Sequence, residues 1–160
     1  MLAFSEEKVY NKIVYLYNYG KGQNMAKKLT RSQARCEAFK LIFELEQHID
    51  ELDFLFDNLV EELPEAITAM QYISGVVSGV AERYEELCGT IEENLKTGWT
   101  ISRISKVSKA ILLLAIYEIK YVADVPEKVA VNEAVELAKA FDEPTSASFV
   151  NGVLAGVLKK

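Results

Sequence analysis

The sequence is poor in the residues that cross-link chains or hold metals. Its two cysteines, Cys36 and Cys88, lie far apart without a Cys-x-x-Cys spacing, and His48 is its single histidine. Two isolated thiols and one imidazole provide neither a disulfide framework nor the clustered ligands of a zinc site. We therefore expect a protein of a reducing cytoplasm that holds no metal and no cofactor.

Long hydrophobic segments are also absent. The longest unbroken apolar run is the eight residues Ala110–Tyr117, whereas a helix needs about 20 apolar residues to cross a bilayer. The N-terminus lacks the apolar core and small-residue cleavage site of a signal peptide. With 160 residues, half of them apolar, the chain is long enough for one domain with a substantial core. We expect a soluble, unexported protein.

Catalytic groups are equally scarce. The sequence contains no second histidine, no nucleophile elbow and no glycine-rich phosphate loop. His48 falls near the end of a predicted helix, where the helix dipole favours a cation, so we expect an exposed residue rather than a general base. Cys36 follows Arg35, which is expected to lower the pKa of the thiol somewhat, but without a histidine partner a structural thiol is the better interpretation. The pattern argues against an enzyme.

Negative charge dominates, but it is unevenly distributed. The chain has a formal net charge of −6, yet residues 21–40 carry six cations against Glu37 alone, a local charge of +5. Residues 41–94 carry fourteen acids against Arg83, a local charge of −13. A small basic patch on an acidic body suits a protein that contacts phosphates at one end and a basic partner at another. From charge alone, the favoured interpretation is that the basic and the acidic regions are both merely solvated faces. Other features have to decide whether either region binds a partner.

Apolar residues recur with helical spacing throughout, and no segment alternates as a β-hairpin does, so the predicted fold class is all-α. Thr30 and Gln33 have the spacing of a capping box, which predicts a helix start at Thr30. Pro64 suits the first turn of a third helix, and Gly98 suits the stop after a fourth. We predict about seven helices, over residues 30–49, 51–62, 64 to the mid-80s, 84–96, 105–121, 126–141 and 144–158.

The first two predicted helices each have one apolar stripe. In the first, Arg31 and Arg35 lie together on a face just outside this stripe, because they are four residues apart. The helix can therefore pack and present cations at once. The expected inward residues are Ala34, Ala38, Leu41, Ile42, Leu45 and Ile49 in the first helix, and Leu52, Leu55, Phe56 and Leu59 in the second.

Two later helices have features that predict close packing. Gly75 and Gly79 are four residues apart on one face of the third helix, a spacing that allows a close helix crossing. A structural homo-oligomer that uses this face is an alternative function, so a homodimer is one expectation. The apolar run Ala110–Tyr117 predicts a central, buried helix. Glu118 at its end must be paired or hydrogen-bonded if it is buried.

A basic cluster stands at the N-terminus of the first helix, where backbone amides and the helix dipole add to the attraction for phosphate. Reading of single-stranded RNA also uses aromatic planes and polar groups, which the turn around Asp124 can supply. The alternative for Asp124 is that it only organises the turn before Pro126. The predicted RNA-binding residues are Lys27, Lys28, Arg31, Arg35, Lys120, Tyr121, Asp124 and Lys128.

Three separate segments agree with one known family. They are Arg31-Ser32-Gln33-Ala34-Arg35 near the start, the run from Ala110 to Glu118 with the turn Asp124-Val125-Pro126, and the helical motifs Asn132-Glu133-Ala134-Val135-Glu136-Leu137-Ala138-Lys139 and Phe149-Val150-Asn151-Gly152-Val153-Leu154. In this order and spacing they resemble the NusB family of bacterial transcription antitermination factors. The resemblance covers Met25 to about Leu158 and implies two small helical bundles packed across each other.

The resemblance implies a non-catalytic RNA-binding factor. NusB proteins bind the boxA element of nascent RNA together with NusE, a ribosomal protein of the small subunit. The pair loads onto transcribing RNA polymerase with other Nus factors, notably in ribosomal RNA operons. The family's arginine-rich start corresponds here to Lys27, Lys28, Arg31 and Arg35, and its turn corresponds to residues 120–128.

The resemblance also implies partner-binding residues. The aromatic in the middle of the first helix, associated with the protein partner, falls on Phe43, where some members have a tyrosine. Glu44, Asp53 and Asp57 are candidates for a basic ribosomal protein, since complementary charge speeds encounter and orients docking. For each of these acids taken singly, a solvated face is the favoured interpretation.

The motif residues that best identify the family are assigned to structure. Asn132 and Asn151 can cap or bridge backbone groups, Glu133 belongs with them, and Gly152 can let helices approach closely. An alternative for the chain as a whole is a detached RNA-recognition module, related to the N-terminal domain of ribosomal RNA cytosine methyltransferases.

Residues 1–24 fall outside the family pattern, while residues 25–160 form the predicted single domain. The stretch before Met25 is rich in tyrosine and ends in a linker-like composition,. We interpret it as an extra N-terminal segment, either a translated upstream region or a disordered one. An accessory helix is the alternative, because Val9, Ile13, Leu16 and Tyr17 have helical spacing.

Overall fold

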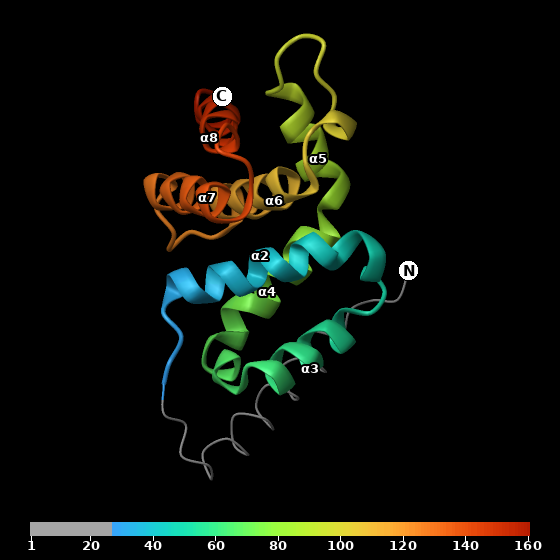
Figure 1. Cartoon of the computed structure of the whole chain (residues 1–160), viewed down its shortest axis with the longest axis vertical. Helices are drawn as coiled ribbons and strands as arrows, with labels where there is room; N and C mark the ends of the chain where they lie inside the picture. The colour runs from blue at the N-terminus through green and yellow to red at the C-terminus, as the bar shows by residue number, and fades with distance from the viewer. Residues whose placement is uncertain (1–26) are drawn as a thin grey trace. The chain divides into compact units, whose positions relative to one another are not determined.

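The computed structural model describes residues 27–160, so the segment predicted at 1–24 lies outside the described residues. These residues form seven α-helices and two 3₁₀ helices and contain no strand, which confirms the all-α class (Figure 1). The elements are α2 (Arg31–His48), α3 (Leu52–Glu62), η1 (Pro64–Ala69), α4 (Met70–Glu82), α5 (Tyr84–Glu93), η2 (Ile101–Arg103), α6 (Lys106–Tyr121), α7 (Glu127–Phe141) and α8 (Ser146–Leu158). The chain divides into two compact units, one up to Ser78 and one from Gly79 to Lys160. Within residues 27–160, no helix combines the length and the hydrophobicity that crossing a membrane requires.

The first unit is built around α2, whose start is fixed by the predicted capping box. Thr30 Oγ1 accepts the backbone N–H of Gln33 at 3.1 Å, and Gln33 Oε1 accepts the backbone N–H of Thr30 at 2.9 Å. α2 packs against α3 and η1. The backbone N–H of Leu29 donates to Thr68 Oγ1 at 3.1 Å, so the segment before α2 is tied to η1.

The apolar stripes predicted for α2 and α3 are buried, with one exception. Ile49 is 44% exposed. It follows the last residue of α2 as the C-cap, so the stripe ends one turn earlier than the sequence predicted.

The third predicted helix consists of two elements. The segment begins as the 3₁₀ helix η1 at Pro64 and becomes the α-helix α4 only from Met70. Proline has no N–H to donate, and the Thr68 hydroxyl donates to the carbonyl of Glu65 at 2.7 Å. The tighter 3₁₀ geometry is common at helix starts. α4 ends at Glu82, because Arg83 leaves the helical conformation before α5.

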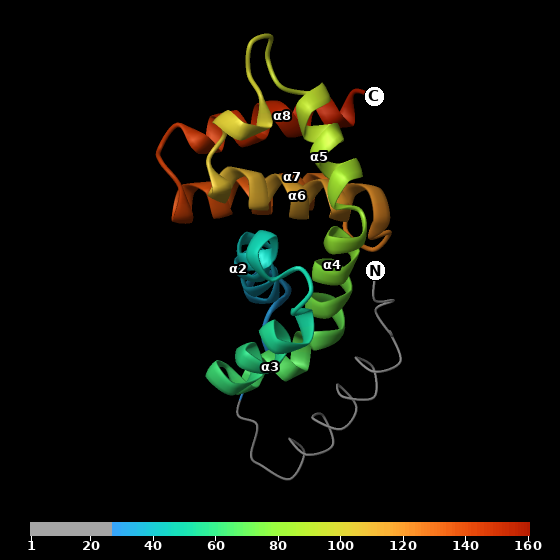
Figure 2. The same cartoon turned by 90° about the vertical axis from the view of Figure 1, so that its right-hand side faces the viewer.

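The second unit surrounds α6. Every residue from Ala110 to Ile116 is buried, which confirms α6 as a central helix. α7 and α8 pack against each other and both contact α6, as the two views show (Figures 1 and 2), and α5 contacts α6 as well. Glu118 is fully buried. No buried side-chain nitrogen or oxygen in residues 27–160 lacks a hydrogen-bond partner, as expected for a buried acid,.

Close approach occurs at Gly79 but not at Gly75. A Cβ at Gly79 would overlap the ring of Tyr117 on α6, whereas no described residue lies within 4 Å of a Cβ at Gly75. The close crossing predicted for this pair therefore belongs to one glycine, and Gly79 is covered within its own unit. The predicted stop after the fourth helix is displaced: α5 ends at Glu93, and Gly98 serves the following loop with a φ of 87°, a conformation that favours glycine.

A carboxylate that the sequence did not single out ties the start of α6 to the end of α7. Asp142 Oδ2 accepts the hydroxyls of Ser105 and Ser108, each at 2.6 Å, while Ser105 also caps α6 by accepting the Ser108 N–H at 2.9 Å. Partial burial raises the pKa of Asp142, but the bonds from Ser105, Ser108 and the Glu143 backbone outweigh it and hold the pKa below its ordinary value,. The folded state thus favours the charged form of this carboxyl.

Candidate nucleic-acid interface

In the first unit, predicted RNA-binding cations surround the N-terminus of α2. Lys27, Lys28 and Arg31 are exposed. The Arg31 guanidinium lies 4.2 Å from the centre of the Tyr72 ring, which α4 supplies. This cation–π contact holds the arginine over an aromatic face. Sequence reasoning missed Tyr72, because only folding brings α4 to α2.

Arg35 differs from the prediction. It is only 2% exposed, although it lies one turn after Arg31 on the same helix. Its guanidinium lies 5.9 Å from the same Tyr72 ring. The spacing of four residues predicts that both arginines lie on one face of the helix. It does not predict which of the two side chains is buried when the helix packs against other elements. The expectation that Arg35 presents its charge on the surface is therefore wrong.

In the second unit, Lys120 and Tyr121 at the end of α6 converge on Glu86 of α5. The Tyr121 hydroxyl donates to Glu86 Oε1 at 2.6 Å. Lys120 Nζ lies 3.2 Å from the same oxygen and donates to Thr90 Oγ1 at 3.0 Å. The Arg83 guanidinium lies 4.4 Å from the centre of the Tyr121 ring. Two predicted RNA-binding residues are thus brought together, but around an acid that the sequence did not single out.

These contacts shift the titration of both hydrogen-bonded groups. The bond from Tyr121, followed by that from Lys120, holds the pKa of Glu86 below its ordinary value. The same bond to Glu86 raises the pKa of Tyr121. Both shifts follow from stabilisation of the charged carboxylate and the neutral phenol. The cluster is therefore a charged, hydrogen-bonded surface at neutral pH.

Asp124 and Lys128 lie close to this cluster along the chain. Both are exposed, one in the turn after α6 and one in the first turn of α7. The turn is anchored by Val125, which is buried and whose N–H donates to the carbonyl of Val122 at 3.1 Å. The predicted RNA-binding residues therefore fall into two groups, one in each unit.

The predicted partner-binding residues all lie in the first unit, on α2 and α3, which pack against each other. Phe43 is 42% exposed, Glu44 and Asp53 are exposed, and Asp57 is half-buried. Phe54 on α3 is 54% exposed and was not predicted. Its exposure could not be read from the sequence, because α3 carries apolar residues on more than its inward face.

The family motif residues in α7 and α8 do not make the structural contacts that were predicted for them. Asn132 and Asn151 are exposed, and their side chains make no hydrogen bond to another described residue. Gly152 is exposed, and no described residue lies within 4 Å of a Cβ there, so it mediates no close approach within the described part of the chain. That role falls to Gly156, where a Cβ would meet Asn94 Oδ1. The capping or bridging predicted for these asparagines and the close helix approach predicted for Gly152 are therefore wrong.

The histidine and cysteine environments do not resemble a catalytic centre. His48 ends α2, and its Nδ1 lies 3.2 Å from Glu51 Oε2, a position that agrees with the predicted C-terminal turn. Burial raises the pKa of the Cys36 thiol, which overturns the expected lowering by Arg35. Within residues 27–160, no three histidine, cysteine or acidic side chains gather as metal ligands would.

Comparison with known proteins places the chain in a family. The NusB family model matches residues 32–159. The chain belongs to the NusB family. This confirms the resemblance that the sequence motifs carried, and the family is one of non-catalytic antitermination factors, in agreement with the prediction that the protein is not an enzyme.

Curated NusB relatives match over most of their length. The chain is 42% identical to the transcription antitermination protein NusB of Levilactobacillus brevis over 132 residues, which cover 81% of this chain and 93% of the relative. It is 46% identical to the NusB of Acetivibrio thermocellus over 129 residues, 81% and 88% of the two chains.

Solved NusB structures share the fold. The T. maritima NusB structure matches with a TM-score of 0.75 and 30% identity, covering 84% of this chain and 94% of that one. A crystal structure of the antitermination factors NusB and NusE in complex with dsRNA matches with a TM-score of 0.70 and 26% identity, covering 81% and 96%.

Proposed function

We propose that this protein is a transcription antitermination factor that binds the boxA element of nascent transcripts, notably those of ribosomal RNA operons, together with the ribosomal protein NusE. It acts in the cytoplasm on the transcribing RNA polymerase with other Nus factors. The observation that carries the proposal is the match, over 81% of the chain, to the NusB of a complex with NusE and dsRNA.

The first unit offers the RNA a compact basic surface. Lys27 and Lys28 are exposed beside the N-terminus of α2, and Arg31 lies over the Tyr72 ring. Phosphates are attracted by the lysines, by Arg31 and by the helix N-terminus. The Tyr72 ring positions the Arg31 guanidinium, whose plane can itself stack on an unstacked base. Arg35 is buried near the Tyr72 ring, so its proposed role is to position that ring rather than to contact phosphate.

The second unit offers a second group. Lys120, Tyr121 and Lys128 are exposed around the turn that contains Asp124. A tyrosine ring supplies a stacking face, and Asp124 can accept a hydrogen bond from a base edge. The lysines supply the charge that phosphate contacts need.

NusE is the proposed protein partner of the first unit. Phe43 and Phe54 expose 42% and 54% of their surface, and exposed aromatics are frequent anchors of protein interfaces,. Glu44, Asp53 and Asp57 supply negative charge that complements a basic ribosomal protein,. The chain thus divides charge between its partners, with cations for RNA and acids for NusE.

Fluorescence anisotropy of a labelled boxA RNA tests the proposal. The protein is titrated alone and with its cognate NusE at two salt concentrations, and a scrambled RNA is the control. Selective binding of boxA that tightens with NusE is expected, with a salt dependence that reports the phosphate contacts. Equal, salt-labile binding of both RNAs that NusE leaves unchanged would contradict it.

A further inference from the structure

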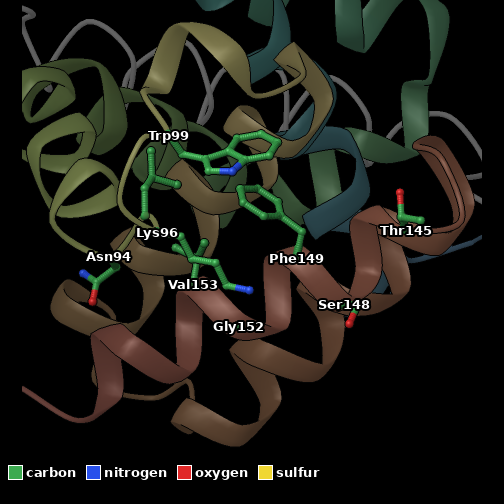
Figure 3. A pocket seen from close by; sticks show the side chains of 9 residues that line it. Asn94, Lys96, Trp99, Thr145, Ser148, Phe149, Gly152 and Val153 are labelled. Atoms are coloured by element: carbon green, nitrogen blue, oxygen red, sulfur yellow. The ribbon is translucent and has the colours of Figure 1, made fainter.

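A pocket of about 540 Å³ lies in the second unit, between the end of α5, the loop that follows and α8 (Figure 3). Its volume falls in the range of about 300–1,000 Å³ that small-molecule sites occupy. None of the residues predicted to bind RNA or a partner lines it. It is therefore a separate feature of the molecule.

Two aromatic rings form one wall of the pocket. The centroids of Trp99 and Phe149 lie 6.1 Å apart with the rings tilted by 33°, and the close-up shows the indole and the phenyl ring next to each other (Figure 3). Trp99 is 52% exposed. An exposed indole in a pocket offers a large flat face on which a further aromatic ring can stack.

Polar side chains that have no hydrogen-bond partner among the described residues also line the pocket. The hydroxyls of Thr145 and Ser148, the indole N–H of Trp99 and the ammonium group of Lys96 all belong to lining residues. None of these side-chain groups hydrogen-bonds to another described residue. Ligand sites typically combine a few such polar groups with an apolar lining.

The charge of the pocket selects the class of ligand. Among the described residues, Lys96 is the only charged one that lines the pocket, and none of the lining residues carries a carboxylate. The sequence from Asn94 to Tyr117 contains cations and no acid, in a chain whose net charge is −6. One of these cations, Arg103, donates to the carbonyl of Gly98 at 3.3 Å, beside Trp99. An anion with an aromatic plane fits this setting, whereas a cation does not.

We propose that this pocket binds one unpaired nucleotide of an RNA strand. The base stacks on Trp99, its edge faces the hydroxyls of Thr145 and Ser148, and its phosphate lies near Lys96. This inference rests on the proposed function and extends it to a further RNA-binding site in the second unit. A strand fits better than a free nucleotide, because Arg103 and other cations of the segment lie outside the pocket lining and suit successive phosphates,.

Trp99 is the single tryptophan of the chain, so its fluorescence reports on the pocket directly. The full chain is titrated with a boxA RNA extended by unpaired nucleotides on both sides, and tryptophan emission is recorded in parallel with anisotropy. We expect quenching that saturates at the same RNA concentration as the anisotropy. Because base stacking contributes about 1–3 kcal/mol, Trp99→Ala should weaken binding by about 5-fold or more, while Trp99→Phe should retain most of the affinity.

Matched variants separate pocket binding from general effects. Gly152 lines the pocket with open space beside it, so Gly152→Leu should obstruct the site and abolish the quenching. Gly75→Leu places the same side chain on an exposed, open position of α4 and should bind RNA as the parent does. Lys96→Gln should weaken binding, whereas Lys159→Gln, with the same charge change outside the lining, should not. Circular-dichroism melting checks that each variant folds.

Four results would overturn the inference. RNA that binds with unchanged tryptophan emission, and with equal affinity for the Trp99→Ala and Gly152→Leu variants, leaves the proposed function standing but removes the pocket from it. Saturable quenching by uridine monophosphate and not by RNA identifies a free-nucleotide site. Quenching by NusE without RNA identifies a protein site. Absence of any RNA binding refutes the proposed function and this inference together.

Discussion

Replacing Glu86 by glutamine tests whether the contacts of this carboxylate with Lys120 and Tyr121 weaken RNA binding. Glu86 accepts the Tyr121 hydroxyl at 2.6 Å and lies 3.2 Å from Lys120 Nζ, the two residues of α6 proposed to contact RNA. A phosphate that approaches Lys120 must therefore displace a carboxylate. The substitution removes this competing charge while keeping the shape of the side chain. We expect Glu86→Gln to bind boxA RNA more tightly than the parent protein.

The magnitude follows from the number of cations released. Each added phosphate contact with a single strand steepens the dependence of log affinity on log salt by about 0.7. Freeing Lys120 adds one contact, so over a fourfold change in salt concentration the affinity gain of Glu86→Gln should change by about 2.5-fold, being larger at low salt. A gain without a steeper slope would indicate that Lys120 does not reach the RNA.

Glu85→Gln is the matched control. Glu85 is the neighbouring exposed acid, and its side chain makes no hydrogen bond or ion pair with another described residue. Both variants raise the net charge by one, so long-range attraction of RNA changes equally. Equal affinities and salt slopes for the two variants would refute the idea that the Glu86 contacts restrain RNA binding.

A titration without RNA checks the contact itself. The hydrogen bond to Glu86 raises the pKa of Tyr121. In Glu86→Gln this pKa should therefore fall toward the ordinary value of a tyrosine, as followed by NMR at alkaline pH. An unchanged Tyr121 pKa would show that the pair does not form in solution.

Three further predictions concern stability and the first unit. Gly79→Ala should lower the free energy of unfolding by about 1–3 kcal/mol through overpacking, while Gly75→Ala, with open space, should raise it by about 0.5–1 kcal/mol. Thermal melting compares the two variants, and equal shifts of the melting temperature would contradict the close approach at Gly79. Asp142→Ala should lower the free energy of unfolding by about 1 kcal/mol at neutral pH. Because the pKa of Asp142 is lower in the folded than in the unfolded state, this contribution is complete above about pH 4 and is lost as the pH falls through the folded pKa. Melting curves of parent and variant should therefore converge in acid. Arg31→Ala should weaken RNA binding and flatten its salt slope without changing the melting temperature, whereas Arg35→Ala should lower that temperature; the reverse assignment would refute the burial of Arg35.

Local signals predicted most of the helices. The capping box at Thr30 fixes the start of α2 because both of its hydrogen bonds join groups three residues apart. The unbroken apolar run predicts α6 as a central helix, because a helix that is apolar all round cannot remain in water. The third helix was the main error. It starts at Pro64 as a 3₁₀ helix and becomes α-helical only from Met70, a change in backbone hydrogen bonding that apolar spacing does not reveal.

The candidate site was only partly predictable. Charge and resemblance selected Lys27, Lys28 and Arg31, and the structure leaves all three exposed. Sequence reasoning did not identify Tyr72 and Glu86, because each of them contacts a residue that lies far away in the sequence. Helical spacing relates residues within one helix, whereas these contacts join two helices.

The sequence by itself determined the all-α class, the family and the segments that become helices, since these rest on spacing, caps and motifs that are local in the chain. The tertiary structure alone decided which predicted cations remain on the surface. Arg31 lies over the ring of Tyr72 and is exposed, while Arg35 is buried beside the same ring. The tertiary structure also placed Glu86 against Lys120 and Tyr121. Burial and charge pairing depend on which helices pack together, and that is a property of the folded chain.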